Sequence, residues 1–210
     1  KKSPFYIADR VGKNEKIFKM IKFRSMVVNA DKSGVDSTSA NDTRITPLGA
    51  LIRKYKIDEI PNFFNIFKGD MSFVGPRPNV KRETDIYTDE EKKLLSVKPG
   101  ITDFASIVFS DEGEILKDSK DPDLDYNQLI RPWKSRLGIF YINKRNLFID
   151  LKLILITAIA ILSRQKALNL VKKLLIKSKA DKKLISVSTR QVSLVPTPPP
   201  GSDSVVENRL

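Results

Sequence analysis

The chain has 210 residues, which is enough for one domain with a substantial hydrophobic core and short additional segments. Its 38 Lys and Arg residues exceed its 25 Asp and Glu residues and give a net charge of +13, so we expect polyanionic partners: nucleotide phosphates, nucleic acid or anionic lipid. The sequence contains no His and no Cys, which excludes Ser-His-Asp triads, thiol nucleophiles, Cys/His zinc sites and disulfides. Carboxylates, lysines, arginines or hydroxyls must therefore perform any catalysis.

The first 26 residues predict a β-hairpin. Residues 5–7 and 17–23 are rich in β-prone side chains, and Gly12-Lys13-Asn14 between them is typical of a turn. Lys22 and Arg24 share one face of the second strand because side chains alternate with period two. Two neighbouring cations of this kind are suited to bind a diphosphate, although an ordinary solvated strand face is the alternative.

A polar segment and a helix follow the hairpin. Residues 27–42 are rich in Gly, Ser, Thr, Asn and Asp, which indicates a loop. Thr46-Pro47 is typical of a helix N-terminus, and this helix is predicted to end just before Asp58. Its apolar positions are Leu48, Leu51, Ile52 and Tyr55.

Asp58 and Glu59 are adjacent carboxylates at the predicted start of the next helix. Asp58 is placed to cap that helix and Glu59 to complement its dipole, which is a purely structural explanation. A chemical explanation is also open, because a carboxylate can attack phosphorus covalently and a neighbouring carboxylate can bind Mg²⁺. Four basic residues lie close to the pair in the sequence: Arg44, Arg53, Lys54 and Lys56.

The helix after this pair carries apolar residues with helical spacing, which predicts a face turned toward the core. These residues are Ile60, Phe63, Phe64 and Phe67. Gly69 is the predicted end of the helix. Farther on, Arg77 lies between Pro76 and Pro78, which fix its backbone, so it is either a phosphate-binding residue or part of a rigid surface turn.

The C-terminal part is basic and partly apolar. Residues 151–162 are strongly apolar but shorter than the roughly 20 residues of a membrane span, so they predict either a core helix or an interfacial helix. Residues 164–190 contain many basic side chains, and Leu168, Val171, Leu174 and Leu175 interleave with helical spacing. This pattern predicts a basic amphipathic helix on an anionic membrane surface, with a solvated charged tail as the alternative. Residues 196–202 are rich in Pro and are expected to be disordered or foreign to the protein.

A series of motifs, in order from about residue 5 to residue 162, resembles the bacterial sugar transferases. These are monotopic phosphoglycosyl transferases, which start glycan assembly on a polyprenyl phosphate. The motifs are Lys22-Phe23-Arg24-Ser25-Met26, Arg44-Ile45-Thr46-Pro47-Leu48-Gly49, Asp58-Glu59-Ile60-Pro61, Asn65, Lys68-Gly69-Asp70-Met71-Ser72, Val74-Gly75-Pro76-Arg77-Pro78 and Pro99-Gly100-Ile101-Thr102.

The resemblance implies transfer of a sugar 1-phosphate from a UDP-sugar to a membrane polyprenyl phosphate, with release of UMP. It implies that Asp58 is the nucleophile and that Glu59 binds Mg²⁺. A helix N-terminus supports this division because it favours an ionised Asp and offers N–H groups to a phosphate. Lys22, Arg24, Arg44 and Arg77 are the predicted phosphate-binding residues.

The chain also departs from the pattern of this family. Members usually begin with an apolar segment that enters and leaves the same leaflet, and we expect that the sequence starting at Lys1 lacks it. After Thr102 the family's usual Gly-aromatic-Ala-Gln-Val run is replaced by Asp103-Phe104-Ala105-Ser106-Ile107, and an Asp common in relatives is missing near Gly138. These differences suggest a particular subgroup.

The resulting prediction is a compact, mostly helical α+β domain with an N-terminal β-hairpin, located at the cytoplasmic face of a bacterial inner membrane. Its predicted divisions are a catalytic domain at residues 1–165, a membrane-proximal segment at 166–190 and a disordered tail at 191–210. Two other classes compete with this prediction. A nucleic-acid-binding module is disfavoured because the basic segment lacks interleaved aromatic residues, whereas an inactive membrane-surface adaptor of the same fold stays open.

Overall fold

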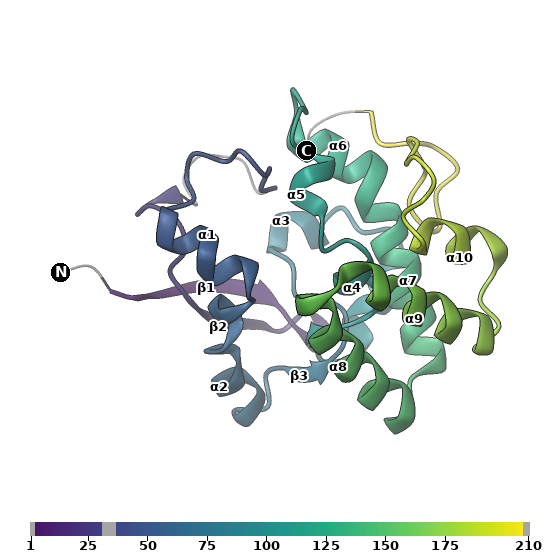
Figure 1. Ribbon diagram of the computed structural model, residues 1–210, viewed down its shortest axis with the longest axis horizontal. Helices are drawn as coiled ribbons and strands as arrows, with labels where there is room; N and C mark the ends of the chain where they lie inside the picture. Colours follow the sequence, from purple (N-terminus) through teal and green to yellow (C-terminus); the bar gives the residue numbers. More distant parts are fainter. Residues whose placement is uncertain (1–2, 31–36, 208–210) are drawn as a thin grey trace.

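The computed structural model describes residues 3–30 and 37–207 of the chain. A hairpin and two short helices form one side of the molecule, on the left in Figure 1, and a set of packed helices forms the other side. This mostly helical architecture with an N-terminal antiparallel hairpin confirms the predicted fold class.

The hairpin consists of β1 (Phe5–Val11) and β2 (Ile17–Phe23), joined through the turn η1 (Lys13–Glu15). Phe18 and Met20 of β2 pack with Met71 in a small separate core. The Asn65 side chain fixes β2 from the adjacent helix, because its Oδ1 accepts from the Ile21 N–H at 3.1 Å and its Nδ2 donates to the Lys19 carbonyl at 2.7 Å. The hairpin is therefore held directly against the segment that carries the acidic pair.

The helix predicted from Thr46-Pro47 is α1 (Pro47–Lys54), and Thr46 caps it by accepting a hydrogen bond from the Gly49 N–H. A 3-10 turn, η3 (Ile57–Glu59), and the helix α2 (Asn62–Phe67) follow. The predicted N-cap role of Asp58 is wrong, because Asp58 lies inside η3 and its side chain caps neither element. The predicted end of the helix is confirmed: α2 stops at Phe67, and Gly69 adopts the left-handed φ of 84°.

A short parallel sheet links the two sides of the molecule. It contains β3 (Ser72–Val74) and β4 (Gly100–Thr102). The two backbones lie so close together just after β3 that a Cβ on Gly100 would lie 2.1 Å from the Gly75 nitrogen. Hydrogen bonds from the Gly75 N–H to the Thr102 carbonyl and from the Gly100 N–H to the Pro76 carbonyl fix this close approach. The backbone leading into Arg77 is therefore held on a rigid support.

The remaining elements surround the main hydrophobic core. They are α3 (Lys81–Thr84), η4 (Glu91–Ser96), α4 (Phe104–Val108), α5 (Glu112–Ile115), α6 (Pro122–Asp125), the π-helical η5 (Tyr126–Ile130), α7 (Arg131–Lys144), α8 (Leu147–Leu162), α9 (Arg164–Lys177) and α10 (Lys182–Ser188). The helix α4 lies at the centre and packs against α7, α8 and α9. Fully buried side chains such as Phe104, Leu137 and Leu153 come from three of these helices.

A buried ion pair connects η4 with α7. Glu91 is completely buried, and its carboxylate accepts two N–H groups of Arg131, from Nε at 3.0 Å and from Nη2 at 2.5 Å, and the Ser135 hydroxyl at 2.7 Å. The Glu91 carboxylate also accepts the Thr88 N–H at 3.1 Å. The buried negative charge of Glu91 is therefore balanced by the positive charge of Arg131 and by hydrogen bonds to both carboxylate oxygens.

The apolar stripe on α2 does not face the core, so that prediction is wrong. Phe64 and Phe67 are exposed, Phe67 to 86%, and Ile60 and Phe63 are also classed as exposed. The Phe63 ring contacts the exposed Phe73 of β3, and β3 packs against α8. On α8 several further apolar side chains are exposed: Leu147, Phe148, Leu151, Ile154, Leu155, Ile161 and Leu162. The elements α2, β3 and α8 lie along the lower part of Figure 1, and we call their exposed apolar residues the apolar surface.

Of the two alternatives for residues 151–162, the core helix is confirmed for one face of α8, which buries Ile149, Leu153 and Ile156; its other face is exposed, and the interfacial position stays a prediction. Residues 164–190 form α9 and α10 rather than one helix, and the leucines and valine of α9 pack into the main core. This placement differs from the prediction of an apolar face on a membrane, because protein already covers that face. In the described part of the chain, no helix combines the length and the apolar character needed to cross a bilayer.

Residues 191–207 also differ from the prediction of a disordered tail. Leu194 packs against the main core, and the Thr197 N–H donates to the Gln128 carbonyl at 3.0 Å. The Gln128 side chain donates to the Val206 carbonyl at 2.7 Å, and the Thr88 hydroxyl donates to the Pro200 carbonyl. Hydrogen bonds therefore hold this segment against η5 and against Thr88, which lies just before η4.

Candidate functional site

Asp58 and Glu59 lie together in the turn η3, with exposed fractions of only 8% and 6%. Lys56 precedes them in a left-handed conformation, with φ of 59°, so the chain bends sharply between α1 and η3. The bend turns both carboxylates away from solvent, although α1 and α2 on either side expose much of their surface. Two adjacent carboxylates with so little solvent access require compensating positive charge.

Glu59 receives that charge from two cations. The Lys22 Nζ donates to Glu59 Oε1 at 2.9 Å, and the Arg77 Nη2 donates to the same oxygen at 2.7 Å. Burial alone would raise the pKa of the Glu59 carboxyl, but the charges of Arg77 and Lys22 outweigh burial and lower this pKa well below its usual range. Glu59 is therefore ionised at neutral pH, and three of the predicted site residues are brought together from β2, η3 and the turn after β3.

Asp58 stands in contrast to its neighbour. Within the residues that the structure describes, no hydrogen bond or ion pair reaches its carboxylate. Its negative charge nevertheless acts on Lys22, Arg53 and Arg77. A carboxylate that is surrounded by positive charge but has no direct partner keeps its oxygens available for reaction.

Of the two cations bonded to Glu59, Lys22 is the one whose charge changes closer to neutral pH. Its side chain is only 13% exposed. Burial and the nearby positive charge of Arg77 lower the pKa of Lys22 to about 8, although Glu59 and Asp58 act in the opposite direction. Lys22 therefore loses its proton at a pH at which an ordinary lysine is still charged.

This lowered pKa predicts a pH dependence of phosphate binding. Lys22 carries its charge below about pH 8 and is neutral above it, so we expect the affinity for UMP to fall as the pH rises through about 8. Titration calorimetry with UMP at several pH values measures this change. In Lys22→Arg the fall is expected at higher pH, whereas Lys19→Arg, three residues away on the same strand and solvent-exposed, should leave the profile unchanged. A flat affinity between pH 7 and about 9.5 would contradict the role of Lys22.

Arg24 is not brought to Glu59. Its Nε donates to the Ser3 carbonyl at 3.0 Å and its Nη2 to the Phe5 carbonyl at 2.9 Å, across the open end of the hairpin. The strand β2 ends at Phe23, so the alternation that placed Arg24 beside Lys22 does not extend to it. These contacts give Arg24 a structural role in the hairpin.

Arg44 also makes other contacts. Its Nε donates to Asp42 Oδ1 at 2.9 Å and its Nη2 to Asp42 Oδ2 at 2.6 Å. It also donates to the carbonyls of Ala30 and Ser37, on either side of residues that lie outside the described part of the chain. Arg44 thus connects parts of the polar loop at residues 27–42.

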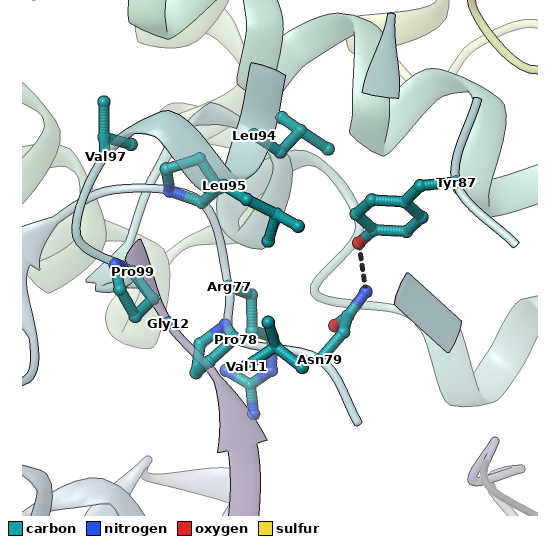
Figure 2. A pocket seen from close by; sticks show the side chains of 11 residues that line it. Val11, Gly12, Arg77, Pro78, Asn79, Tyr87, Leu94, Leu95, Val97 and Pro99 are labelled. Carbon is teal, nitrogen blue, oxygen red and sulfur yellow. Dashed lines mark hydrogen bonds between the residues drawn. The ribbon is translucent and has the colours of Figure 1, made fainter. Parts of the chain in front are cut away.

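Arg77 is exposed to 38%, and its one hydrogen bond to Glu59 leaves most of its N–H donors unused within the described residues. It borders two small pockets. The first is lined mainly by apolar residues, and Figure 2 shows Arg77 and Pro78 on one side of it, with Leu94 and Leu95 on the other. The adjacent Asn79 donates to the Tyr87 hydroxyl at 2.8 Å, which fixes the segment after Arg77 (Figure 2).

The acidic pair is the candidate protein contribution to a Mg²⁺ site. In the described ranges, no group of three or more acidic side chains is placed to hold a metal ion. Mg²⁺ often binds through one or two carboxylates together with waters and substrate phosphates, so Asp58 and Glu59 are a sufficient protein contribution. Because Glu59 Oε1 already accepts from Lys22 and Arg77, its Oε2 is the oxygen left for a cation. The residues fit an ion that binds together with a phosphate ligand.

Sequence reasoning missed two residues on the opposite side of the site. The charge of Lys134, from α7, acts on Lys56, and the charge of Glu112, from α5, acts on Arg77. Lys134 and Glu112 form an ion pair of 2.7 Å. No motif marks either residue, and more than 50 positions separate them from the acidic pair. Only the packing of the helices brings them to the site.

Residues 1–164 match the family described as bacterial sugar transferase. Curated relatives include galactosyl transferase CpsE of Streptococcus agalactiae serotype III (strain NEM316), 38% identical over 160 residues, which are 71% of this chain and 32% of that protein. The UDP-glucose:undecaprenyl-phosphate glucose-1-phosphate transferase of Xanthomonas campestris pv. campestris is 35% identical over 175 residues, covering 78% of this chain and 32% of the relative.

A third relative is the UDP-N-acetylgalactosamine-undecaprenyl-phosphate N-acetylgalactosaminephosphotransferase of Aeromonas hydrophila. It is 41% identical over 106 residues, covering 49% of this chain and 25% of the relative. The chain thus spans about a third or less of the length of these three relatives. The names of the Xanthomonas and Aeromonas relatives include a UDP-sugar and undecaprenyl phosphate, and the three names differ in the sugar.

Proposed function

Because the chain belongs to the bacterial sugar transferase family, we propose that it transfers a sugar 1-phosphate from a UDP-sugar to undecaprenyl phosphate and releases UMP. Such a transfer would initiate the assembly of a bacterial glycan. The observation that carries the proposal is the arrangement of Asp58: a buried carboxylate without a direct partner among the residues that the structure describes, beside a Glu59 that is fixed by Lys22 and Arg77.

The proposed reaction has two displacements at phosphorus. In the first, an Asp58 oxygen attacks the phosphorus that bears the sugar, and the bond from this phosphorus to the bridging oxygen breaks. UMP leaves with that electron pair, and the sugar phosphate is esterified to Asp58. In the second, a phosphate oxygen of undecaprenyl phosphate attacks the same phosphorus, and the Asp58 carboxylate leaves. Positioning and charge stabilisation supply most of the catalysis in reactions of this class.

The cations of the site support both displacements. Lys22 and Arg77 offset the negative charge of two phosphate-bearing substrates, and Arg77 has unused donors with which to bind phosphate oxygens in pairs. Glu59 keeps both cations in place before a substrate binds. Mg²⁺ held by Glu59, and by the substrate, would supply further positive charge for the leaving UMP.

Measurement of UMP tests this function. The chain is incubated with Mg²⁺, undecaprenyl phosphate in detergent and each of four donors: UDP-glucose, UDP-galactose, UDP-N-acetylglucosamine and UDP-N-acetylgalactosamine. We expect one or more donors to release UMP. When undecaprenyl phosphate is omitted, each chain should release no more than one UMP, because the sugar phosphate then stays on Asp58. If a longer form of the protein, extended to the length of its relatives, releases UMP from none of the four donors, the proposed activity is wrong.

The exposed side chains support a position at a membrane surface. The apolar surface on α2, β3 and α8 contains aromatic and aliphatic residues that would be costly to leave in water. It includes α2, which directly follows the turn that carries Asp58. A bilayer in contact with α2 would bring the phosphate of a lipid carrier close to the site. We therefore propose that the chain lies on the cytoplasmic leaflet, with an anionic membrane as its partner.

The double substitution Phe64→Glu and Phe67→Glu tests this position. Each Phe is expected to contribute about 1.5 to 3 kcal/mol if it is buried in lipid, so we expect the double substitution to weaken vesicle binding about a hundredfold or more. Flotation with vesicles that contain phosphatidylglycerol measures the bound fraction. Val195→Glu, at an exposed apolar position in the C-terminal segment, is the control for added charge. An equal loss in this control would contradict the assignment of the apolar surface.

A further inference from the structure

The second pocket beside Arg77 has both polar and apolar residues in its lining, and three of these residues come from α7. Arg77, Tyr126 and Lys134 line it, together with polar residues that are already engaged elsewhere. Asp103 and Ser106 bond to each other in the capping box of α4, and Arg131 and Ser135 bond to Glu91. These engaged residues shape the pocket but have little capacity left for a ligand.

Three lining side chains keep unused hydrogen-bonding capacity. Arg77 uses one of its donors for Glu59, and Lys134 uses one of its three for Glu112. The Tyr126 side chain is buried, yet within the described residues its hydroxyl makes no hydrogen bond. This hydroxyl is not among the fully buried side-chain atoms without a partner, so it is accessible at the pocket, where a ligand can bond to it.

Lys134 is held in a defined position. Its Nζ lies 2.7 Å from Glu112 Oε2 and 5.1 Å from the centre of the Tyr126 ring, and its side chain is only 17% exposed. Fixed placement reduces the entropy lost when a ligand binds. Arg77 lines this pocket and also bonds to Glu59, so the pocket adjoins the acidic pair.

We propose that this pocket binds the sugar of the donor, with Lys134 and Tyr126 contacting its hydroxyl or acyl groups and Glu112 positioning Lys134. The proposal rests on the proposed function. If Asp58 attacks the phosphorus that bears the sugar, the sugar is the group bonded directly to the reacting centre, whereas the nucleoside lies one phosphate farther away. A pocket that shares Arg77 with the reacting centre therefore fits the sugar better than the nucleoside. Lysine and tyrosine donors with unused capacity suit the hydroxyl and carbonyl oxygens of sugars.

Binding measurements with and without the sugar test the proposal. Titration calorimetry compares the most tightly bound of the four UDP-sugars with UMP, in wild type and in Lys134→Met and Tyr126→Phe. We expect Lys134→Met to weaken UDP-sugar binding about ten- to hundredfold, the range for a lost hydrogen bond to a charged group, and to leave UMP binding unchanged. Lys134→Arg, which keeps the charge and the donors, should retain more of the affinity. Lys144→Met, at an exposed position at the end of the same helix, is the matched control.

The outcomes separate this proposal from the proposed function. Equal weakening of UMP and UDP-sugar would assign the pocket to the nucleotide and overturn the sugar assignment, as would unchanged UDP-sugar binding in Lys134→Met. If wild-type protein binds none of the UDP-sugars, the proposed function fails before the pocket is tested. Thermal melting of each variant identifies a general loss of structure, and a Glu112→Gln variant that melts normally but binds UDP-sugar weakly would support its positioning role.

Discussion

Asp58→Asn is expected to reduce UMP release by at least about a thousandfold, the scale seen when a covalent nucleophile is removed. The amide has nearly the same size as the carboxylate but lacks its charge and its nucleophilic oxygen. Because the Asp58 side chain has no hydrogen-bond partner among the described residues, the substitution breaks no contact in the fold. The melting temperature should stay close to that of wild type, and UMP affinity should not fall because a negative charge is removed near the cations, which distinguishes a chemical defect from a structural one.

The control for this prediction is Asp9→Asn. It makes the same chemical change at an exposed aspartate, whose partner Lys19 is also exposed, and should leave UMP release intact. Mass spectrometry of the peptide that contains Asp58, after incubation with donor alone, should detect the added sugar phosphate in wild type and not in Asp58→Asn. UMP release that persists in Asp58→Asn would assign the nucleophile to another residue.

Glu91→Ala is expected to be the most destabilising of the substitutions considered, by about 3 to 5 kcal/mol. The substitution leaves the buried guanidinium of Arg131 without its opposite charge and removes the acceptor of the Ser135 hydroxyl. A loss of this size is a large part of the stability of an ordinary domain, so a clearly lower urea midpoint is expected. Denaturation by urea, followed by circular dichroism, measures the free energy of unfolding.

The neighbouring Glu90→Ala provides the comparison. Glu90 forms a surface ion pair with Lys93, both partly exposed, and such pairs contribute about 0 to 1 kcal/mol. Glu91→Gln keeps the shape of the side chain and can still accept hydrogen bonds, so its loss of stability should lie between those of the two alanine variants. Equal urea midpoints for Glu90→Ala and Glu91→Ala would show that the buried ion pair contributes no more to the free energy of unfolding than the surface pair does.

Local patterns in the sequence predicted the local structure of this protein well. The β-hairpin, the cap at Thr46 and the helix end at Gly69 all follow from side-chain alternation, hydrogen-bonding side chains and backbone freedom within a few residues. The stripe on α2 was predicted with the correct spacing but assigned to the wrong surroundings. Periodicity shows that one side of a helix is apolar, and it does not show whether protein or another apolar medium covers that side.

The candidate site was predictable only in part, because its residues come from distant segments. Charge and motif identified Lys22, Glu59 and Arg77. In the structure, Glu59 accepts hydrogen bonds from Lys22, 37 positions earlier in the chain, and from Arg77, 18 positions later. Arg24 was predicted to lie beside Lys22 from the alternation of side chains along a strand, but β2 ends at Phe23, one residue before it. Lys134 carries no signal in its neighbourhood, because its role depends on the packing of α7 beside α4 and η5.

The main core also sets a limit on how this protein can be divided. The family match ends at residue 164, but Leu168, Val171 and Leu175 of α9 are buried among helices that precede this point. A fragment that stops at the family boundary would leave a hydrophobic trough along α4 and α8 open to water. The unit that folds is therefore longer than the unit shared by descent, and experiments on shortened forms should retain α9 and the segment hydrogen-bonded to Thr88 and Gln128.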